Sequence, residues 1–281
     1  MIKININTII EGDALQVLKT LDSQSVNMCI TSPPYWGLRD YKHNGQLGQE
    51  KRPEEYIENL CNVFDEVFRV LRDDGTLWVN LGDTYINKKH KLPEYKNKSL
   101  ALIPHLFVIE MSKRGWICRN DIIWHKPNAM PSPIKDRFTV DFEYIFFFSK
   151  KEHYYFEQQK EDNKDSYNGR RGSSKTRTKF ESAMKGDVSE TRKHYKTRNV
   201  RTTWSINTKP FKEAHFATYP DDLIRIPILA GCPIGGVVLD PFMGSGTTAI
   251  VALKYSRNYI GIELVRDSIV IANNRVKKFL C

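Results

Sequence analysis

A short stretch near the N-terminus combines residue types that could do chemistry. TSPPY places Ser32 before two consecutive prolines, Pro33 and Pro34, with the aromatic Tyr35 after them. Because a proline lacks a backbone N–H and restricts the residue before it, the pair should end the preceding apolar run in a rigid, extended turn. Which chemistry would need a serine and a tyrosine in such a rigid turn at the end of a strand depends on a second stretch of the chain.

A second stretch, DPFMGSGTT from Asp240 to Thr248, has the composition of a ligand-binding turn. It follows an apolar run and precedes a helical pattern, so its glycines would let the backbone approach a ligand at the helix N-terminus. Glu263 comes 23 residues after Asp240, at the end of the next apolar run. An acidic residue in that place binds ribose hydroxyls in nucleotide-binding βαβ units.

The residues around this turn favour a ligand without phosphates. A P-loop would have a lysine after the last glycine, where Thr247 and Thr248 stand, and Ala249 occupies the place of the third glycine of the dinucleotide fingerprint. The turn has no cluster of basic residues, and the carboxylate of Asp240 suits a cationic amino-acid end. S-adenosylmethionine therefore fits this pattern better than NAD or ATP. The alternative is a glycine-rich turn with a purely structural role.

The hydrophobic pattern indicates the elements that would position both stretches. Apolar runs predict strands in INTII, VNMCI, TLWVNL, WICRNDIIWHK, DFEYIFFFSK, GGVVLD and NYIGIE. Residues 52–75 predict the clearest helix, with Pro53 in its first turn, one apolar face and Gly75 as its stop. Further helices are expected near 12–25, 100–111, 219–231, 246–256 and 264–280. Strands separated by helices indicate an α/β sheet that is partly parallel.

The composition is that of an ordinary folded chain. Its 281 residues are 40% hydrophobic, and no run approaches the roughly 18 apolar residues that a membrane span needs. The N-terminus MIKININTIIEGD lacks the apolar core of a signal peptide. Five scattered cysteines without CxxC spacing argue against a disulfide framework or a metal site. We therefore expect a cytoplasmic protein without a membrane partner.

One segment contains almost all of the excess positive charge. The net charge of the chain is +10, and residues 160–212 contain 15 Lys or Arg against 6 Asp or Glu. Large apolar side chains are sparse there, so the segment can bury little core. We expect residues 1–156 and 204–281 to form one catalytic domain around a small basic insertion, 157–203. A basic patch suits nucleic acid, and the alternative is a solvated loop without a partner.

Taken together, the two stretches make the chain resemble the amino-methylating DNA methyltransferases, which produce N4-methylcytosine or N6-methyladenine. LRDDGTLWVNLGDTY, IIWHKPNAMPSP, DFEYIFFFSK and HFATYP also look like segments of that family. The order, with TSPPY first and DPFMGSGTT last, is that of the family's permuted beta group. The resemblance implies an α/β fold with a Rossmann-like, seven-stranded mixed sheet. It also implies S-adenosylmethionine as methyl donor and double-stranded DNA as partner.

For TSPPY, the resemblance implies the catalytic role. The exocyclic amine of a base is a poor nucleophile and lies inside the duplex, so the base must be flipped into a pocket. Ser32 and the carbonyl beside Pro33 and Pro34 would accept hydrogen bonds from the amine, which favours a localised lone pair on its nitrogen. Tyr35, together with Trp36, would stack on the flipped base. Transfer is expected to be direct, because no cysteine follows a proline as in cytosine-C5 methyltransferases.

For the cofactor, the resemblance implies residues from several parts of the chain. They are Asp13, Ala14, Thr31, His215, Phe216, Ala217, Asp240, Pro241, Phe242, Gly244, Gly246, Thr247, Thr248 and Glu263. Alternatives stay open for several of them, since Asp13 could instead cap a helix and His215 could be a structural histidine. Asp240 and Glu263 could likewise be helix-capping or salt-bridged carboxylates. In DFEYIF, Phe142 stands before Glu143 where family members often have histidine, so a contact made by that histidine is not expected here.

DNA contacts are expected from the loop after TSPPY and from the basic insertion. The candidates are Trp36, Arg39, Arg170, Arg171, Lys175, Arg177, Lys193, Arg198 and Arg201. Serine in the first position of the tetrapeptide is typical of cytosine enzymes, so we expect a site-specific cytosine-N4 methyltransferase. N6-adenine methylation, RNA or protein methylation, and a binding protein that has lost the chemistry are the alternatives. A companion restriction endonuclease, and either a monomer or a homodimer, are compatible with the resemblance.

Overall fold

A computed structural model shows how these patterns fold, and it describes residues 5–38, 40, 43, 45–163, 196–209 and 219–281. The chain divides into two compact units. The larger unit consists of residues 1–157 and 201–281, and the smaller one of residues 158–200. In the described part of the chain, no helix has both the length and the apolar character needed to cross a membrane.

The larger unit is built on an eight-stranded mixed sheet with the strand order β1-β10-β9-β2-β3-β5-β4-β8. The strands are β1 (Thr8–Glu11), β2 (Val26–Thr31), β3 (Leu71–Leu81), β4 (Ile117–His125), β5 (Phe142–Ser149), β8 (Thr203–Ser205), β9 (Val237–Asp240) and β10 (Asn258–Glu263). The five neighbouring strands β1, β10, β9, β2 and β3 are mutually parallel, whereas β5 runs antiparallel to β3 and β4. All seven strands expected from the sequence are present, and the three-residue β8 adds an eighth at the edge beside β4.

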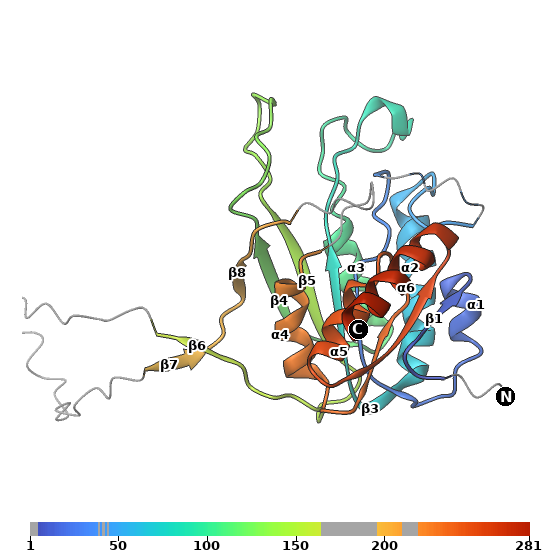
Figure 1. Cartoon of the computed structure of the whole chain (residues 1–281). Helices are drawn as coiled ribbons and strands as arrows, with labels where there is room; N and C mark the ends of the chain where they lie inside the picture. Colours follow the sequence, from blue (N-terminus) through green and yellow to red (C-terminus); the bar gives the residue numbers. More distant parts are fainter. Residues whose placement is uncertain (1–4, 39, 41–42, 44, 164–195, 210–218) are drawn as a thin grey trace, which may run out of the picture. The chain divides into compact units, whose positions relative to one another are not determined.

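Helices cover both faces of this sheet (Figure 1). One face carries α1 (Ala14–Leu18), α2 (Pro53–Val70) and α3 (Ile103–Lys113), and the other carries α4 (Asp221–Gly231), α5 (Thr247–Lys254) and α6 (Arg266–Leu280). A 3-10 turn, η1 (Lys88–His90), lies in the loop after β3. Because both faces are covered, central strands such as FEYIFFFS in β5 are apolar almost throughout.

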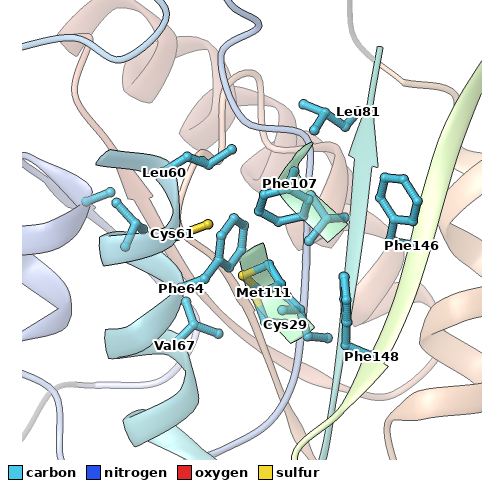
Figure 2. Packing of buried hydrophobic residues seen from close by; sticks show 14 of the residues in the cluster. Cys29, Leu60, Cys61, Phe64, Val67, Leu81, Phe107, Met111, Phe146 and Phe148 are labelled. Carbon is cyan, nitrogen blue, oxygen red and sulfur yellow. The ribbon is translucent and has the colours of Figure 1, made fainter. Parts of the chain in front are cut away.

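The main core lies between the sheet and the helices α2 and α3 (Figure 2). Phe64 of α2 meets Phe107 of α3 edge to face, with ring centroids 5.4 Å apart. Phe146 and Phe148 of β5 point toward this cluster, because alternate strand residues share a face. Phe147 lies on the opposite face, where its ring stacks on that of Trp78. Alternating aromatic residues of β5 therefore serve both layers.

The boundary between α2 and β3 differs from the prediction that Gly75 ends the helix. The helix begins with Pro53 and two glutamates in its first turn, as expected, but it ends at Val70. β3 begins at the next residue, Leu71, and Gly75 lies inside this strand. Leu71 is fully buried and pairs with Val26 of β2, so its sheet contacts take precedence over another helical turn.

The smaller unit contains a short antiparallel pair, β6 (Lys160–Asp162) and β7 (Thr197–Asn199). Arg198 of β7 donates from Nε to Oε1 of Glu161 in β6 at 2.8 Å. This pair joins the two ends of the basic insertion. Residues 164–195, which contain most of the charge expected to contact DNA, lie outside the described residues.

Candidate active site

A cavity of about 640 Å³ opens at the carboxyl edge of the sheet. The parallel strands β1, β10, β9, β2 and β3 all end here, and β4 turns into β5 at the same edge. Ligand sites of open α/β sheets form at such an edge. TSPPY and the glycine-rich turn both contribute to the cavity wall, so the fold brings together the two stretches that the sequence singled out.

The tetrapeptide follows β2 directly, and its backbone is held in place by neighbouring elements. Ser32, Pro33, Pro34 and Tyr35 all line the cavity, and Pro33 is the most buried of the four. The carbonyl of Pro34 accepts a hydrogen bond from the hydroxyl of Tyr56 in α2 at 2.8 Å. This carbonyl therefore already has one donor and a fixed direction, and the hydroxyl of Ser32 lies on the cavity wall beside it. Ser32 therefore has a side-chain oxygen on the cavity wall that can accept a hydrogen bond from a ligand.

The hydroxyl of Tyr35 lies at the centre of a polar network. Its oxygen is 2.7 Å from Oε2 of Glu143 in β5 and 3.3 Å from the Oγ of Ser32. Asn80 of β3 donates from Nδ2 to the same Glu143 oxygen at 3.0 Å, and Lys126 forms an ion pair with Oε1. Burial and the charge of Glu143 raise the pKa of Tyr35 well above its ordinary value. Tyr35 is therefore a neutral phenol with a fixed hydrogen-bonding role.

The glycine-rich turn between β9 and α5 is tied to the end of β10 through Glu263. Gly244 has a φ of 52°, in the left-handed region that glycine adopts without strain, and its N–H donates to Oε2 of Glu263 at 2.7 Å. The other oxygen accepts from the N–H of Val265 at 2.8 Å. The carboxylate lines the cavity, and burial raises its pKa. It therefore presents remaining lone pairs to a ligand that offers hydroxyl groups.

Asp240 is fully buried behind this wall and does not line the cavity. Its Oδ1 accepts from the hydroxyl of Thr31 at 2.6 Å and from the N–H of Phe242 at 3.0 Å. Its Oδ2 accepts from Tyr219 at 2.9 Å and from the hydroxyl of Thr248. Burial raises the pKa of Asp240 above its ordinary value, although each donor acts in the opposite direction. The carboxylate fixes the turn from behind, and its four partners leave it no place for direct contact with a cofactor.

The cofactor residues expected from the sequence thus separate into two groups. The structure places Thr31, Gly246 and Thr248 with Asp240 behind the wall, where all are buried. The Cβ that any other residue would add at Gly246 would lie 2.8 Å from the Cβ of Ala272 in α6, so this glycine serves helix packing. On the wall itself are Asp13, Ala14, Pro241, Phe242, Gly244, Thr247 and Glu263.

Asp13 caps a helix and also lies on the cavity wall. Its Oδ1 accepts from the N–H of Gln16 at 3.0 Å and caps α1, and the residue also lines the cavity. The segment of His215, Phe216 and Ala217 lies outside the described residues. Tyr219, which follows it, lines the cavity and holds Asp240, a role that the sequence did not suggest because its partners are far away in the chain.

A third part of the wall comes from the end of β4 and from the segment after β8. Asn128 exchanges hydrogen bonds with the backbone of Thr208, one from Nδ2 to the carbonyl and one from the N–H to Oδ1, both at 2.9 Å. Lys126 and Lys209 line the same side of the cavity. Lys126 and Asn128 belong to IIWHKPNAMPSP, one of the segments that resemble the family, which did not indicate a role for either residue. The register of β4 on β5 explains their place, since Trp124 pairs with Glu143.

The residues expected to contact DNA have mixed outcomes. Trp36 is only 2% exposed, stacks on His90 and donates from Nε1 to the carbonyl of Glu50, so its indole belongs to the core and does not reach a base in the cavity. Arg201 is exposed, and Arg198 is the partner of Glu161. Arg39, Arg170, Arg171, Lys175, Arg177 and Lys193 lie outside the described residues. Within the described ranges, no three His, Cys, Asp or Glu side chains converge as metal ligands do.

Comparisons with curated sequences identify close relatives over the whole length of the chain. The sequence is 40% identical to the Type II methyltransferase M.Cfr9I of Citrobacter freundii, over 98% of this chain and 89% of that protein. It is 37% identical to M.SmaI of Serratia marcescens, over 95% of this chain and 90% of that one. The relatives therefore share both motif-bearing regions and the segment between them.

Solved structures show the same architecture. TTHA0409 from Thermus thermophilus, solved in complex with S-adenosyl-L-methionine, is 27% identical with a TM-score of 0.65, over 97% of this chain and 95% of that one. The PvuII DNA methyltransferase has a TM-score of 0.68 at 21% identity, over 97% of this chain and 89% of that one, which shows the fold. The family model described as DNA methylase matches residues 26–274. The chain therefore belongs to the DNA methylase family of amino-methyltransferases, with S-adenosylmethionine as its cofactor.

Proposed function

We propose that this chain is a site-specific DNA methyltransferase that transfers a methyl group to the exocyclic N4 amine of a flipped-out cytosine. The observation that carries the proposal is Ser32 on the cavity wall, next to Tyr35 and opposite the glycine-rich turn. The resemblance associates serine in this position with cytosine enzymes. N6-adenine methylation would use the same cavity and the same acceptor, and it is the second candidate because the family model covers both amines.

The cavity suits a nucleoside cofactor without phosphates. Its volume of about 640 Å³ is within the range of small-molecule sites. A phosphate would need free N–H groups at the glycine-rich turn, but the N–H of Gly244 already donates to Glu263. The carboxylate of Glu263 suits ribose hydroxyls, and Asp13 and Phe242 lie on the same wall. S-adenosylmethionine would supply an electrophilic methyl group on a sulfonium.

On the base side, the protein's task is to hold the amine with its lone pair directed at that methyl group. Ser32 would accept a hydrogen bond from the amine, and the prolines keep the acceptor from turning away. Tyr35 lines the cavity, and its ring would stack on the flipped base as the resemblance implies. Cys29, Cys61 and Cys232 are buried and none lines the cavity, so the proposed transfer proceeds directly between cofactor and base.

For DNA binding, we propose the basic insertion 157–203 as the target-recognition region. Its lysines and arginines would contact phosphates, and a subset of its polar side chains would read base edges. The curated relatives carry the name Type II methyltransferase, so we also propose that a companion restriction endonuclease exists. Affinity for duplex DNA should then fall steeply with salt concentration.

The test is to incubate the protein with unmethylated duplex DNA and isotope-labelled S-adenosylmethionine, digest the DNA to nucleosides and identify the labelled product by mass spectrometry. Labelled N4-methylcytosine is the expected result. Labelled N6-methyladenine would retain the reaction type and overturn the assignment of the base. Absence of label in DNA from several sources of different base composition would overturn the proposed activity.

A further inference from the structure

The network beside the cavity fixes the direction of its hydrogen bonds. A phenol has one hydrogen to donate, and the carboxylate of Glu143 is its strongest acceptor because the contact is charge-assisted and the shortest, at 2.7 Å. Asn80 offers the phenol only a second, longer and uncharged acceptor, Oδ1 at 3.3 Å, because its amide nitrogen donates to Glu143 and to the carbonyl of Tyr144. The phenolic oxygen of Tyr35 is left with lone pairs only.

Ser32 must then donate to Tyr35. The two oxygens are 3.3 Å apart, and with the phenolic hydrogen committed to Glu143 only the serine hydrogen can lie between them. The lone pairs of Oγ are what remain for the cavity. A chain of donors therefore runs from Ser32 through Tyr35 to Glu143, and the Lys126 ammonium anchors its far end by pairing with the other carboxylate oxygen.

We propose that Glu143, acting through the hydroxyl of Tyr35, sets the hydrogen-bond polarity of Ser32 and makes its Oγ an obligate acceptor facing the target base. This deepens the proposed function, on which it rests for the identity of the base. The site then selects a group that donates, the amine of cytosine or adenine, and disfavours the carbonyl that thymine has in the same place. In this proposal Glu143 is a positioning residue, because it acts on the base through Tyr35 and Ser32.

The packing around Glu143 shows why its charge matters to this arrangement. Lys126, at the end of β4, and Tyr35, after β2, are the ionisable groups that contact the carboxylate, and Asn80 of β3 adds an uncharged donor. Both side chains of the Glu143–Lys126 pair are 18% exposed. In a Glu143→Gln protein the amide oxygen would stay with Lys126, so the amide nitrogen would donate toward Tyr35 and would face the donating nitrogen of Asn80. The Asn80 amide would then have to turn, its Oδ1 would no longer accept from Tyr35, and the phenolic hydrogen would pass to Ser32. The hydrogen of Ser32 would then point at the base.

The test is a double-mutant cycle at positions 35 and 143, measured as single-turnover kcat and as DNA affinity. Tyr35→Phe keeps the ring and removes the hydroxyl, and we expect kcat to fall about 10-fold with unchanged DNA affinity. Glu143→Gln should lower kcat by about 100-fold, because Ser32 then opposes the amine. Adding Tyr35→Phe to Glu143→Gln should raise kcat again, since no hydroxyl remains to donate to Ser32.

The matched control is the exposed pair Tyr155 and Glu157, in which the same hydroxyl–carboxylate contact occurs at 3.3 Å away from the cavity. Tyr155→Phe and Glu157→Gln should leave kcat unchanged. Wild-type kcat for Tyr35→Phe would overturn the proposal and leave Tyr35 a stacking residue only. Multiplicative effects of the two substitutions on kcat would also overturn it. If Glu143 had only a structural role, adding Tyr35→Phe to Glu143→Gln would not raise kcat.

A readout without cofactor or DNA separates this proposal from the proposed function. Carbon-13 NMR of labelled tyrosine in the free protein, assigned with Tyr35→Phe, reports ionisation of the Tyr35 phenol. Glu143→Gln should lower the pKa of Tyr35, because the charge of Glu143 is one of the causes that raise it. An unchanged titration would show that the two groups do not interact and would overturn the proposal, even if the labelling assay confirms the methylated base. Failure of the labelling assay alone would overturn only the proposed function.

Discussion

Asp240 and Glu143 are two carboxylates at the same edge of one sheet, and they differ in what surrounds them. Asp240 is fully buried, and four donors enclose it, from β2, from α5, from the turn after β9 and from the segment before α4. Glu143 lies on the cavity wall, where it pairs with Lys126 and reaches Ser32 through Tyr35. The four donors leave Asp240 no free lone pair for a ligand. Glu143, by contrast, can act through Tyr35 and Ser32 on a molecule in the cavity.

This difference separates residues that stabilise the structure of the site from residues that act on the reacting group. Donors that converge on a buried carboxylate hold segments together, so their loss should appear mainly in stability. A network that ends at the cavity wall affects the reacting group, so its loss should appear in turnover. Substitutions around Asp240 should therefore change stability, and substitutions at Ser32 should change activity.

The largest effect is expected for Asp240→Ala. The substitution leaves the N–H of Phe242 and three hydroxyls without their acceptor in a buried place, which should lower the free energy of unfolding by about 3–5 kcal/mol. Urea denaturation followed by circular dichroism measures it. Asp240→Asn is the control, because hydroxyls can rotate to accept from its amide, and its loss should be clearly smaller. Equal losses for both variants would contradict the hydrogen-bonding role.

Ser32→Ala tests the opposite side of the comparison. Removing the acceptor from the cavity wall should lower kcat about 100-fold or more, with DNA affinity and stability unchanged, because the contact strengthens in the transition state. Single-turnover kinetics and a fluorescence binding assay measure the two quantities. Ser112→Ala, in the exposed face of α3, is the control. A proportional loss of DNA affinity would show that Ser32 contributes to binding and not to the chemical step.

The sequence predicted most of this arrangement because the decisive signals are local. Apolar runs indicated the seven main strands, and the prolines and glycines placed TSPPY and DPFMGSGTT in turns at strand ends. Parallel strands then bring such turns to one edge. The stop of α2 at Val70 was missed because the burial of Leu71 in the sheet depends on β2, which lies far away in the chain.

The roles of individual side chains were harder to predict, because they depend on contacts between distant segments. The sequence predicted Asp240 as a cofactor ligand, but in the structure Tyr219 and Thr31 donate hydrogen bonds to its carboxylate. Trp36 looked like a stacking residue, but its indole packs on His90 in the core. A residue type next to a motif does not reveal which way its side chain points. The network of Tyr35 and Glu143 likewise requires the pairing of β5 with both β3 and β4.

Glu263→Gln should weaken cofactor binding, with a smaller expected effect than the two substitutions above. The carboxylate accepts from the N–H groups of Gly244 and Val265, and an amide nitrogen would oppose one of them. We expect the dissociation constant of S-adenosylhomocysteine, measured by isothermal titration calorimetry, to rise about 10-fold. Glu11→Gln, which changes the exposed partner of Arg266, is the control. An unchanged dissociation constant would place the ribose elsewhere on the wall.

The smallest expected effect is the pH dependence of stability contributed by Asp240. Burial raises its pKa in the folded protein above the unfolded value of about 3.9. The folded state therefore binds this proton more tightly, so the contribution favours folding below the unfolded pKa and is lost as pH rises through the folded pKa. The free energy of unfolding of the wild type, minus that of Asp240→Asn, should be larger at pH 4 than at pH 7.5. Glu263, whose pKa is also raised, is present in both proteins, so its contribution cancels in this difference. A difference that increases with pH would mean that the four donors outweigh burial, and Asp240 would then stabilise the fold as a charged group.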